Sequence, residues 1–293
     1  MTGANSGLGL QTAIALAAAG AHVTLACRDG KRGETARAKI AHEVPRASTE
    51  LRPLDLASLA SVRAFAKELD REGKPLDLLI NNAGVMAAPQ RKTEDGFELQ
   101  LGTNHLGHYA LTGLLLERLR AAPAPRVITV SSQGHRYGRI AFDDLQFERR
   151  YNAWRAYGQS KLANLLFARE LQRRAEAAGL ELRSVAVHPG YSNTNLTSSG
   201  PQLGSKLRLD AIGMKLTDVL LATSDRFGAE PSLYAATHPD VPGGAFVGPT
   251  RLFQSRGPVG LVDSTRAGKD PEVAKRLWEV SGQLTGVRYL DGD

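Results

Sequence analysis

Cysteine and long apolar runs are the scarcest features of this sequence. Cys27 is the only cysteine among 293 residues, so the chain cannot form an internal disulfide, which is typical of a reducing cytoplasm. No apolar run reaches the roughly 18 residues that a membrane span needs, and no basic segment followed by an apolar one opens the chain. We therefore expect a cytoplasmic protein without a membrane-spanning segment.

Basic clusters are also missing, although the formal net charge is +7. The lysines and arginines are scattered, and no zinc-finger or RNA-binding signature accompanies them, so we do not expect nucleic acid as a partner. An anionic small ligand would account for part of the excess charge. The hydrophobic and charged shares, 42% and 23%, are those of an ordinary globular protein.

The chain opens with a glycine-rich stretch that runs into an apolar helix. The helix is expected over residues 8–19, and Gly20 ends it. Gly3, Gly7 and Gly9 lack side chains where a backbone must approach a pyrophosphate, and the helix N-terminus supplies N–H groups and partial positive charge. The spacing is GxxxGxG rather than the commoner GxGxxG, and a glycine-rich helix cap without a ligand is the alternative.

An apolar strand before this glycine turn is absent, whereas a dinucleotide-binding turn normally follows one. The numbering begins where that strand would end, so we expect a truncated sequence, with Met1 at an alternative or misassigned start. An upstream reading frame that encodes roughly five to ten apolar, β-branched residues would support this expectation.

The strand expected over residues 21–28 ends without a carboxylate. An acidic residue at this point normally binds the adenosine ribose of NAD, whereas here Cys27 is followed by Arg28, with Lys31 and Arg32 close by. Because a guanidinium pairs with a 2′-phosphate in a bidentate manner, the sequence favours NADP(H) over NAD(H), with Arg28 as the phosphate ligand. Lys31 fits a solvated charge at the start of a surface helix.

Apolar strands and amphipathic helices alternate along most of the chain. Further strands are expected over residues 49–54, 76–80, 126–130, 182–188 and 243–247, and further helices over 31–43, 58–71, 100–119, 154–178 and 271–281. This alternation predicts a doubly wound α/β parallel sheet, the Rossmann fold, in a single domain over residues 1–293.

Polar and small residues follow several of these strands, at the edge where parallel sheets bind ligands. These residues are Asp55-Leu56, Asn81-Asn82-Ala83-Gly84, Ser131-Ser132 and Pro189-Gly190. Asp55 could instead serve only as a helix N-cap, and residues 81–84 could form only a turn.

The expected helix over residues 100–119 contains three polar residues of interest. His105 and His108 have helical i,i+3 spacing, but no third ligand is evident, so we expect no metal site. Asn104 is unfavourable in the middle of a helix unless its amide is used, which makes it a candidate functional residue.

Tyr157 and Lys161 lie four residues apart and therefore on one face of their expected helix. A fixed ammonium beside a tyrosine favours the phenolate and brings the phenol pKa towards the working range. Hydride transfer from a nicotinamide needs a proton donor at the carbonyl oxygen and a polarising hydrogen bond beside it, which a tyrosine, a serine and a lysine can supply.

The periodicity weakens after residue 190. We expect a substrate-binding or lid segment over residues 191–240 and a C-terminal extension over residues 250–293. The apolar residues between positions 207 and 221 could form a core helix, a lid over an apolar substrate or a membrane-surface contact.

Taken together, four motifs resemble the classical short-chain dehydrogenase/reductase family. In chain order they are Thr2-Gly3-xxx-Gly7-x-Gly9, Asn81-Asn82-Ala83-Gly84, Ser131-Ser132 and Tyr157-xxx-Lys161, and the match spans nearly the whole chain. The long spacing from Ser132 to Tyr157, the segment Ala26-Cys27-Arg28 and the segment Ser160-Lys161-Leu162-Ala163-Asn164 are similar to the retinol dehydrogenase and protochlorophyllide reductase branch.

The resemblance implies four catalytic roles. Tyr157 would be the general acid/base, and Ser132, rather than Ser131, would orient the substrate oxygen. Lys161 would bind the nicotinamide ribose and tune Tyr157, and Asn104 would hold a water in the proton relay.

The resemblance also implies a set of cofactor contacts. The pyrophosphate would contact Gly3, Ser6, Gly7, Leu8 and Gly9, and the 2′-phosphate would contact Arg28. Adenine would lie between Asp55 and Leu56, and the adenosine side would be lined by Asn82, Ala83 and Gly84. The carboxamide would be held by Pro189, Gly190 and the residues up to Thr194.

Two functions fit these features. The first is an NADP(H)-dependent oxidoreductase that acts on an apolar or aromatic alcohol or carbonyl substrate, and the resemblance implies a homodimer or homotetramer. The second is a non-catalytic dinucleotide-binding sensor or scaffold, and an inactive truncated fragment is a third possibility. The joint presence of Ser132, Tyr157, Lys161 and Asn104 favours the oxidoreductase, because a sensor needs only the glycine turn.

Overall fold

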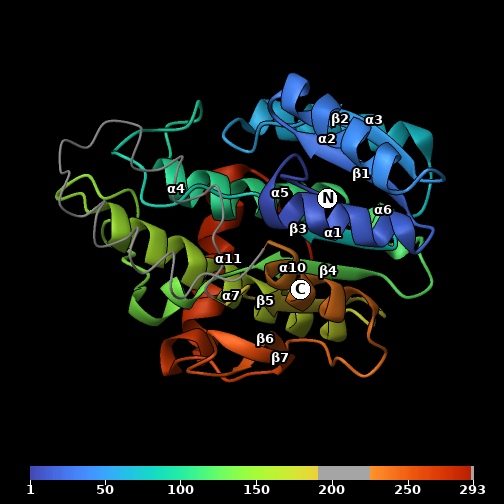
Figure 1. The fold of residues 1–293 in the computed structure, drawn as a ribbon. Coiled ribbons are helices and arrows are strands. Elements are labelled where there is room, and N and C mark those ends of the chain that lie inside the picture. The colour runs from blue at the N-terminus through green and yellow to red at the C-terminus, as the bar shows by residue number, and fades with distance from the viewer. Residues whose placement is uncertain (191–224, 292–293) are drawn as a thin grey trace, which may run out of the picture.

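Seven strands form the centre of this computed structural model, which describes residues 1–190 and 225–291 (Figure 1). They are β1 His22–Cys27, β2 Ser48–Pro53, β3 Leu78–Asn81, β4 Arg126–Val130, β5 Arg183–Val187, β6 Phe246–Arg251 and β7 Arg256–Leu261. The strands β1 and β2 pair in parallel, and β3 to β6 form a parallel sheet in the order β3-β4-β5-β6, to which β7 adds an antiparallel edge.

The first three residues lie between the two groups of strands. The N–H group of Thr2 donates to the Ile80 carbonyl at 3.0 Å, and that of Gly3 donates to the Ala26 carbonyl at 3.0 Å. Thr2 also forms a parallel bridge with Ala26. These bonds join the two-stranded sheet β1-β2 to the five-stranded sheet β3-β4-β5-β6-β7 through residues 1–3, so the glycine turn begins between β1 and β3.

Helices cover both faces of the sheet (Figure 1). One layer contains α1 Gly7–Ala18, α2 Gly30–Glu43 and α10 Asp225–Thr237, and the other contains α3 Leu59–Glu72, α5 Gly107–Leu114, α7 Ala153–Ala177 and α11 Pro271–Thr285. Each layer has its own core cluster, with Leu25 and Ile40 on the first side and Phe65 and Leu111 on the second. The alternation of strands and helices confirms the doubly wound α/β fold.

Local sequence signals account for the ends of several helices. Ser58, Asn152 and Asp270 accept backbone N–H bonds at the starts of α3, α7 and α11, as Ser, Asn and Asp caps do. Gly73 and Gly286 adopt left-handed conformations just after α3 and α11, where glycine carries no steric penalty.

The helix expected over residues 100–119 is interrupted. It consists of α4 Leu99–Leu101, a π-helical turn η1 Gly102–Leu106, α5 and α6 Leu116–Arg120. The π turn carries Asn104, whose side chain bonds to a neighbouring loop. Single π turns occur often at functional sites, because they redirect a side chain out of the regular ladder.

Two expectations for the C-terminal half were incomplete. The last parallel strand is Phe246–Arg251 rather than residues 243–247, and the antiparallel strand β7 was missed. Two 3₁₀ turns complete the described elements: η2 covers Gln133–Tyr137 and η4 covers Arg266–Lys269.

The described part of the C-terminal extension belongs to the main core. Trp278 of α11 is buried and stacks on Phe167 of α7, with ring centroids 5.9 Å apart. Most of the expected lid segment, residues 191–224, lies outside the described residues, and the part after it forms α10, which packs against α1.

Candidate active site

The glycine turn folds tightly on itself and could not carry side chains at two positions. Gly3 has φ +64°, and an added Cβ there would lie 2.9 Å from the Ala83 Cα. An added Cβ at Gly9 would lie 2.2 Å from the Gly3 carbonyl oxygen. Ser6 precedes α1 without capping it through its side chain, and the first N–H groups of a helix have no partner within it. Bare backbone at a helix N-terminus fits a pyrophosphate.

Thr2 connects this turn to the loop after β3. Its hydroxyl accepts the backbone N–H groups of Asn82 and Ala83 at 2.9 and 3.0 Å. The Asn82 amide in turn donates to the Thr2 carbonyl at 2.9 Å. The buried His108 ring also bonds to the Thr2 hydroxyl, at 2.9 Å. No local sequence pattern indicates this contact between Thr2 and His108, because the two residues are 106 positions apart.

The end of β1 carries a buried thiol followed by an arginine. Cys27 is buried, and burial raises the pKa of its thiol, whereas Arg28 is exposed. No hydrogen bond or ion pair engages the Arg28 side chain within residues 1–190 and 225–291. Asp29, the nearest carboxylate in sequence, is occupied as the N-cap of α2, where it accepts the Arg32 N–H at 3.0 Å.

Asp55 and Leu56 follow β2, as expected. Ser58, not Asp55, caps α3, and the Asp55 carboxylate accepts the N–H of Ala57 at 2.9 Å. The helix-cap alternative for Asp55 is therefore wrong. Leu56 is buried against α5, where an added Cβ at Gly107 would lie 2.5 Å from the Leu56 carbonyl oxygen.

Asn104 connects the loop after β3 to α7. Its amide nitrogen donates to the Val85 carbonyl and to the Ser160 hydroxyl, both at 2.9 Å, and its oxygen accepts the Val85 N–H at 2.8 Å. An added Cβ at Gly84 would lie 3.1 Å from the Asn104 Oδ1 and 3.4 Å from the Lys161 Nζ. Gly84 thus approaches both polar atoms closely, where a side chain would crowd them.

The two serines after β4 have different surroundings. The Ser131 hydroxyl is buried and donates to the Lys161 carbonyl at 2.7 Å. The Ser132 hydroxyl accepts the N–H of Gly134 at 3.1 Å, and its hydrogen bond with the Tyr157 phenol favours a lower Tyr157 pKa. Ser131 therefore fixes α7 to the sheet, whereas Ser132 lies beside Tyr157.

Tyr157 and Lys161 are both buried on α7. The Lys161 Nζ donates to the Val130 carbonyl at 3.0 Å and lies 5.9 Å from the centre of the Tyr157 ring. Burial raises the pKa of Tyr157, and the Ser132 hydroxyl opposes this shift. Burial lowers the pKa of Lys161 to about 8. The expected lowering of the Tyr157 pKa by Lys161 is thus not found, because desolvation of the phenolate dominates.

The segment after β5 meets the hairpin of β6 and β7. Gly190 has φ +72°, and an added Cβ there would lie 2.6 Å from the Ser255 carbonyl oxygen. Its N–H donates to the His188 Nδ1 at 3.2 Å. Pro189 and Gly190 therefore lie at the carboxyl edge of the sheet, and Thr194 lies outside the described residues.

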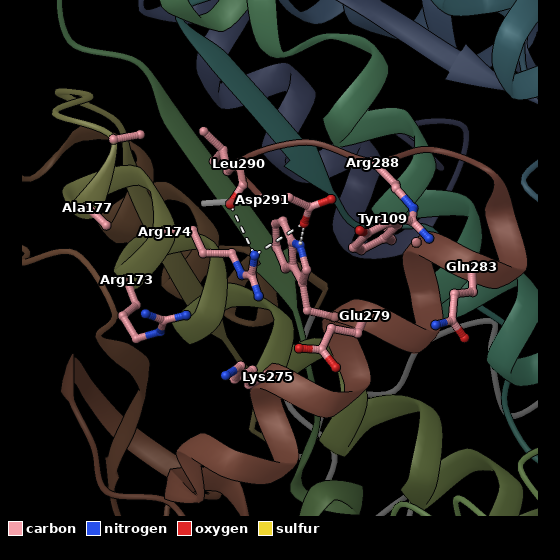
Figure 2. A pocket seen from close by; sticks show the side chains of 13 residues that line it. Tyr109, Arg173, Arg174, Ala177, Lys275, Glu279, Gln283, Arg288, Leu290 and Asp291 are labelled. Atoms are coloured by element: carbon pink, nitrogen blue, oxygen red, sulfur yellow. Dashed lines mark hydrogen bonds and ion pairs between the residues drawn. The ribbon is translucent and has the colours of Figure 1, made fainter. Parts of the chain in front are cut away.

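One cavity lies away from these residues. It has a volume of about 540 Å³ and is formed by α7, α11 and the residues that follow α11 (Figure 2). Arg174 stacks over the Trp278 ring at 4.9 Å and donates to the Leu290 carbonyl at 3.0 Å. None of the residues expected in the site lines this cavity.

Neither a metal-binding cluster nor a membrane-spanning helix is found among residues 1–190 and 225–291. No group of His, Cys, Asp and Glu there could hold a metal ion. His105 and His108 instead bond to Ser281 and Thr2. No described helix is long and apolar enough to cross a membrane.

The site brings a glycine turn, an exposed arginine and a buried Tyr–Lys pair to the carboxyl ends of the parallel strands. Such an arrangement defines a dinucleotide-binding α/β protein with a candidate proton donor. Comparison with known proteins gives the family: the family model for short chain dehydrogenases matches residues 1–202, and the chain belongs to this family. It is an oxidoreductase that acts on CH–OH or C=O groups with a nicotinamide cofactor.

Several relatives match almost the whole chain. The chain is 43% identical to retinol dehydrogenase 13 of Homo sapiens, over 98% of this chain and 84% of that protein. It is 42% identical to retinol dehydrogenase 12 of Mus musculus, over 99% and 86%. The crystal structure of an uncharacterized Mycobacterium paratuberculosis protein is 47% identical, with a TM-score of 0.81 over 98% of this chain and 92% of that one. These matches confirm the retinol dehydrogenase-like assignment.

Proposed function

We propose that the protein is an NADP(H)-dependent oxidoreductase that acts on an apolar or aromatic alcohol or carbonyl substrate, with Tyr157 as general acid/base. The observation that carries this proposal is the buried Tyr157 phenol beside the Ser132 hydroxyl, one helical turn from the Lys161 ammonium. Retinol is an apolar alcohol, and the names of the retinol dehydrogenase relatives support an apolar substrate.

The cofactor would lie along the carboxyl edge of the sheet, and when bound it supplies or accepts the hydride. The pyrophosphate would contact the turn that includes Gly3, Ser6, Gly7, Leu8 and Gly9, in which close packing excludes side chains at Gly3 and Gly9. Asp55 and Leu56 would flank adenine, and Asn82, Ala83 and Gly84 would line the adenosine side. Lys161 would hold the nicotinamide ribose, and Pro189, Gly190 and Thr194 the carboxamide.

The proton would move through the chain's own side chains. Burial keeps the Tyr157 phenol protonated at neutral pH, which suits a donor to the oxygen of a carbonyl substrate. The Ser132 hydroxyl would hold that oxygen in place. The tyrosinate would recover its proton through Lys161 and a water held by Asn104, whose Oδ1 and the Lys161 Nζ both lie close to Gly84.

The preference for NADP(H) is proposed from the charges at the end of β1. A 2′-phosphate beside Arg28 would meet an exposed guanidinium that has no other partner within residues 1–190 and 225–291, and the neighbouring Asp29 carboxylate is engaged as the N-cap of α2. Direct titration with NADPH and, in parallel, NADH tests this proposal. Tighter NADPH binding supports it, and equal or tighter NADH binding contradicts it.

We also infer a homodimer or homotetramer in the cytoplasm. Strand β7 is the edge of the described sheet and exposes Leu261, and such an edge can pair with a second chain. The lone, buried Cys27 is compatible with a reducing compartment. Light scattering coupled to size exclusion measures the mass, and a monomer at micromolar concentration contradicts the oligomer.

A further inference from the structure

Two aromatic side chains beside Tyr157 are exposed without belonging to the core. Tyr137 of η2 is 52% exposed and Trp154 of α7 is 43% exposed, whereas Tyr157 is only 5% exposed. Large aromatic rings bury extensive apolar area when they can, so half-exposed rings next to a catalytic group suggest a ligand surface.

The Trp154 ring meets Tyr157 directly. The two rings are edge to face, with centroids 6.4 Å apart and an interplanar angle of 87°. Trp154 lies three residues before Tyr157 on α7, and this spacing places both side chains on the same face of the helix. Asn152 caps the helix at this point by accepting the N–H groups of Trp154 and Arg155, so the backbone that carries the indole is fixed.

The Tyr137 ring also lies close to Tyr157, in a slot made by two glycines. An added Cβ at Gly158 would lie 2.7 Å from the Tyr137 ring, and an added Cβ at Gly134 would lie 3.1 Å from the Tyr137 hydroxyl and 2.9 Å from the Tyr157 ring. Any larger residue at either glycine would therefore displace one of the two tyrosines. The Tyr137 phenol is close enough to Tyr157 to raise the Tyr157 pKa, and desolvation of the covered part of the Tyr137 ring raises the pKa of Tyr137.

We infer that Tyr137 and Trp154 are specificity-determining residues that form two aromatic walls for a flat, conjugated or aromatic carbonyl substrate. This inference rests on the proposed function. A planar unsaturated group can lie against both rings and keep its carbonyl oxygen at Tyr157 and Ser132. A saturated chain of the same size makes no ring-to-ring contacts and loses more conformational freedom when it binds.

The test compares two aldehydes of equal carbon number, cinnamaldehyde and nonanal, with NADPH as the reductant. The readout is the ratio of their kcat/KM values in each variant divided by the ratio in the wild type, so the intrinsic reactivities of the aldehydes cancel. Trp154→Ala and Tyr137→Ala should each lower this ratio about threefold to tenfold, mainly through KM for cinnamaldehyde.

Variants that keep an aromatic ring test whether the two rings contact the substrate or only support the local fold. Trp154→Phe and Tyr137→Phe should hold the ratio close to the wild-type value, since both keep an aromatic face. Phe253→Ala is a matched control, because Phe253 is 95% exposed and has no ring contact with Tyr157 among the described residues. Tyr137→Ala enlarges the slot beside Gly158 and could disturb folding, but the Trp154 variants test the inference independently.

Different outcomes separate this inference from the proposed function. If the alanine variants reduce both aldehydes with the wild-type ratio, the rings are not specificity determinants, while the oxidoreductase function stands. If the kcat/KM ratio falls as far in the phenylalanine variants as in the alanine variants, the aromatic-wall explanation is wrong. If the wild type binds NADPH but reduces neither aldehyde nor any other carbonyl compound, the proposed function itself fails.

Discussion

Gly9→Ala should disrupt the cofactor turn and weaken the fold. The new Cβ would lie 2.2 Å from the Gly3 carbonyl oxygen and 2.7 Å from the Asn82 amide nitrogen. The first contact is with backbone, so no side-chain rotation relieves it. Overpacking of this kind costs about 1–3 kcal/mol, whereas Ala in place of Gly within a helix gains only about 1 kcal/mol. We therefore expect a net loss of stability.

Thermal unfolding and NADPH titration on the same samples measure both consequences. Each kcal/mol lost should lower Tm by roughly 2–4 °C for a domain of this size. The Kd for NADPH should rise about tenfold, because a shifted turn no longer presents its N–H groups to the pyrophosphate. Gly30→Ala is the matched control, since Gly30 begins α2 and an added Cβ there meets nothing within 4 Å. A Gly9→Ala protein with wild-type Tm and wild-type NADPH affinity would refute the close-packing argument.

Three further predictions concern charge and hydroxyl groups. Arg28→Ala should weaken NADPH binding at least tenfold in titrations and leave NADH binding unchanged; parallel losses for both cofactors would contradict the assignment. Lys161 has a lowered pKa of about 8, so it is protonated below that pH and loses its charge above it. NADPH affinity should thus fall as pH rises through 8 in the wild type. A Lys161→Met variant whose NADPH affinity falls over the same pH range would contradict this. Ser131→Ala should lower Tm, because the Lys161 carbonyl loses the Ser131 hydroxyl as a hydrogen-bond donor. Ser132→Ala should instead lower kcat with little change in Tm. If Ser131→Ala lowered kcat and Ser132→Ala lowered Tm, the two assignments would be wrong.

Much of the fold could be predicted because its signals are local. The strand over residues 126–130 and the starts of α1, α7 and α11 follow from apolar periodicity and capping residues, and they agree within one residue with the structure. The break in the helix over residues 100–119 was missed because its cause is tertiary. The Asn104 side chain bonds to Val85 and Ser160, which are distant in sequence, and the π turn accommodates those bonds.

The candidate site was predictable in its parts but not in its connections. Motif spacing indicated Ser132, Tyr157 and Lys161, and the structure brings them together at one edge of the sheet. The role of Thr2 as a bridge between the glycine turn, Asn82 and His108 has no sequence signature. The raised pKa of Tyr157 could not be foreseen from Tyr–Lys spacing, because it depends on burial that only the packed structure defines.

The most direct test of the central claim is the turnover of Tyr157→Phe with NADPH and a carbonyl substrate that the wild type reduces. Phenylalanine keeps the buried ring and removes only the hydroxyl, so the fold and the NADPH affinity should remain at wild-type values. Loss of the proton donor should lower kcat by about 10²–10⁴-fold. Turnover at the wild-type rate, with NADPH bound equally well, would show that Tyr157 is not the general acid/base.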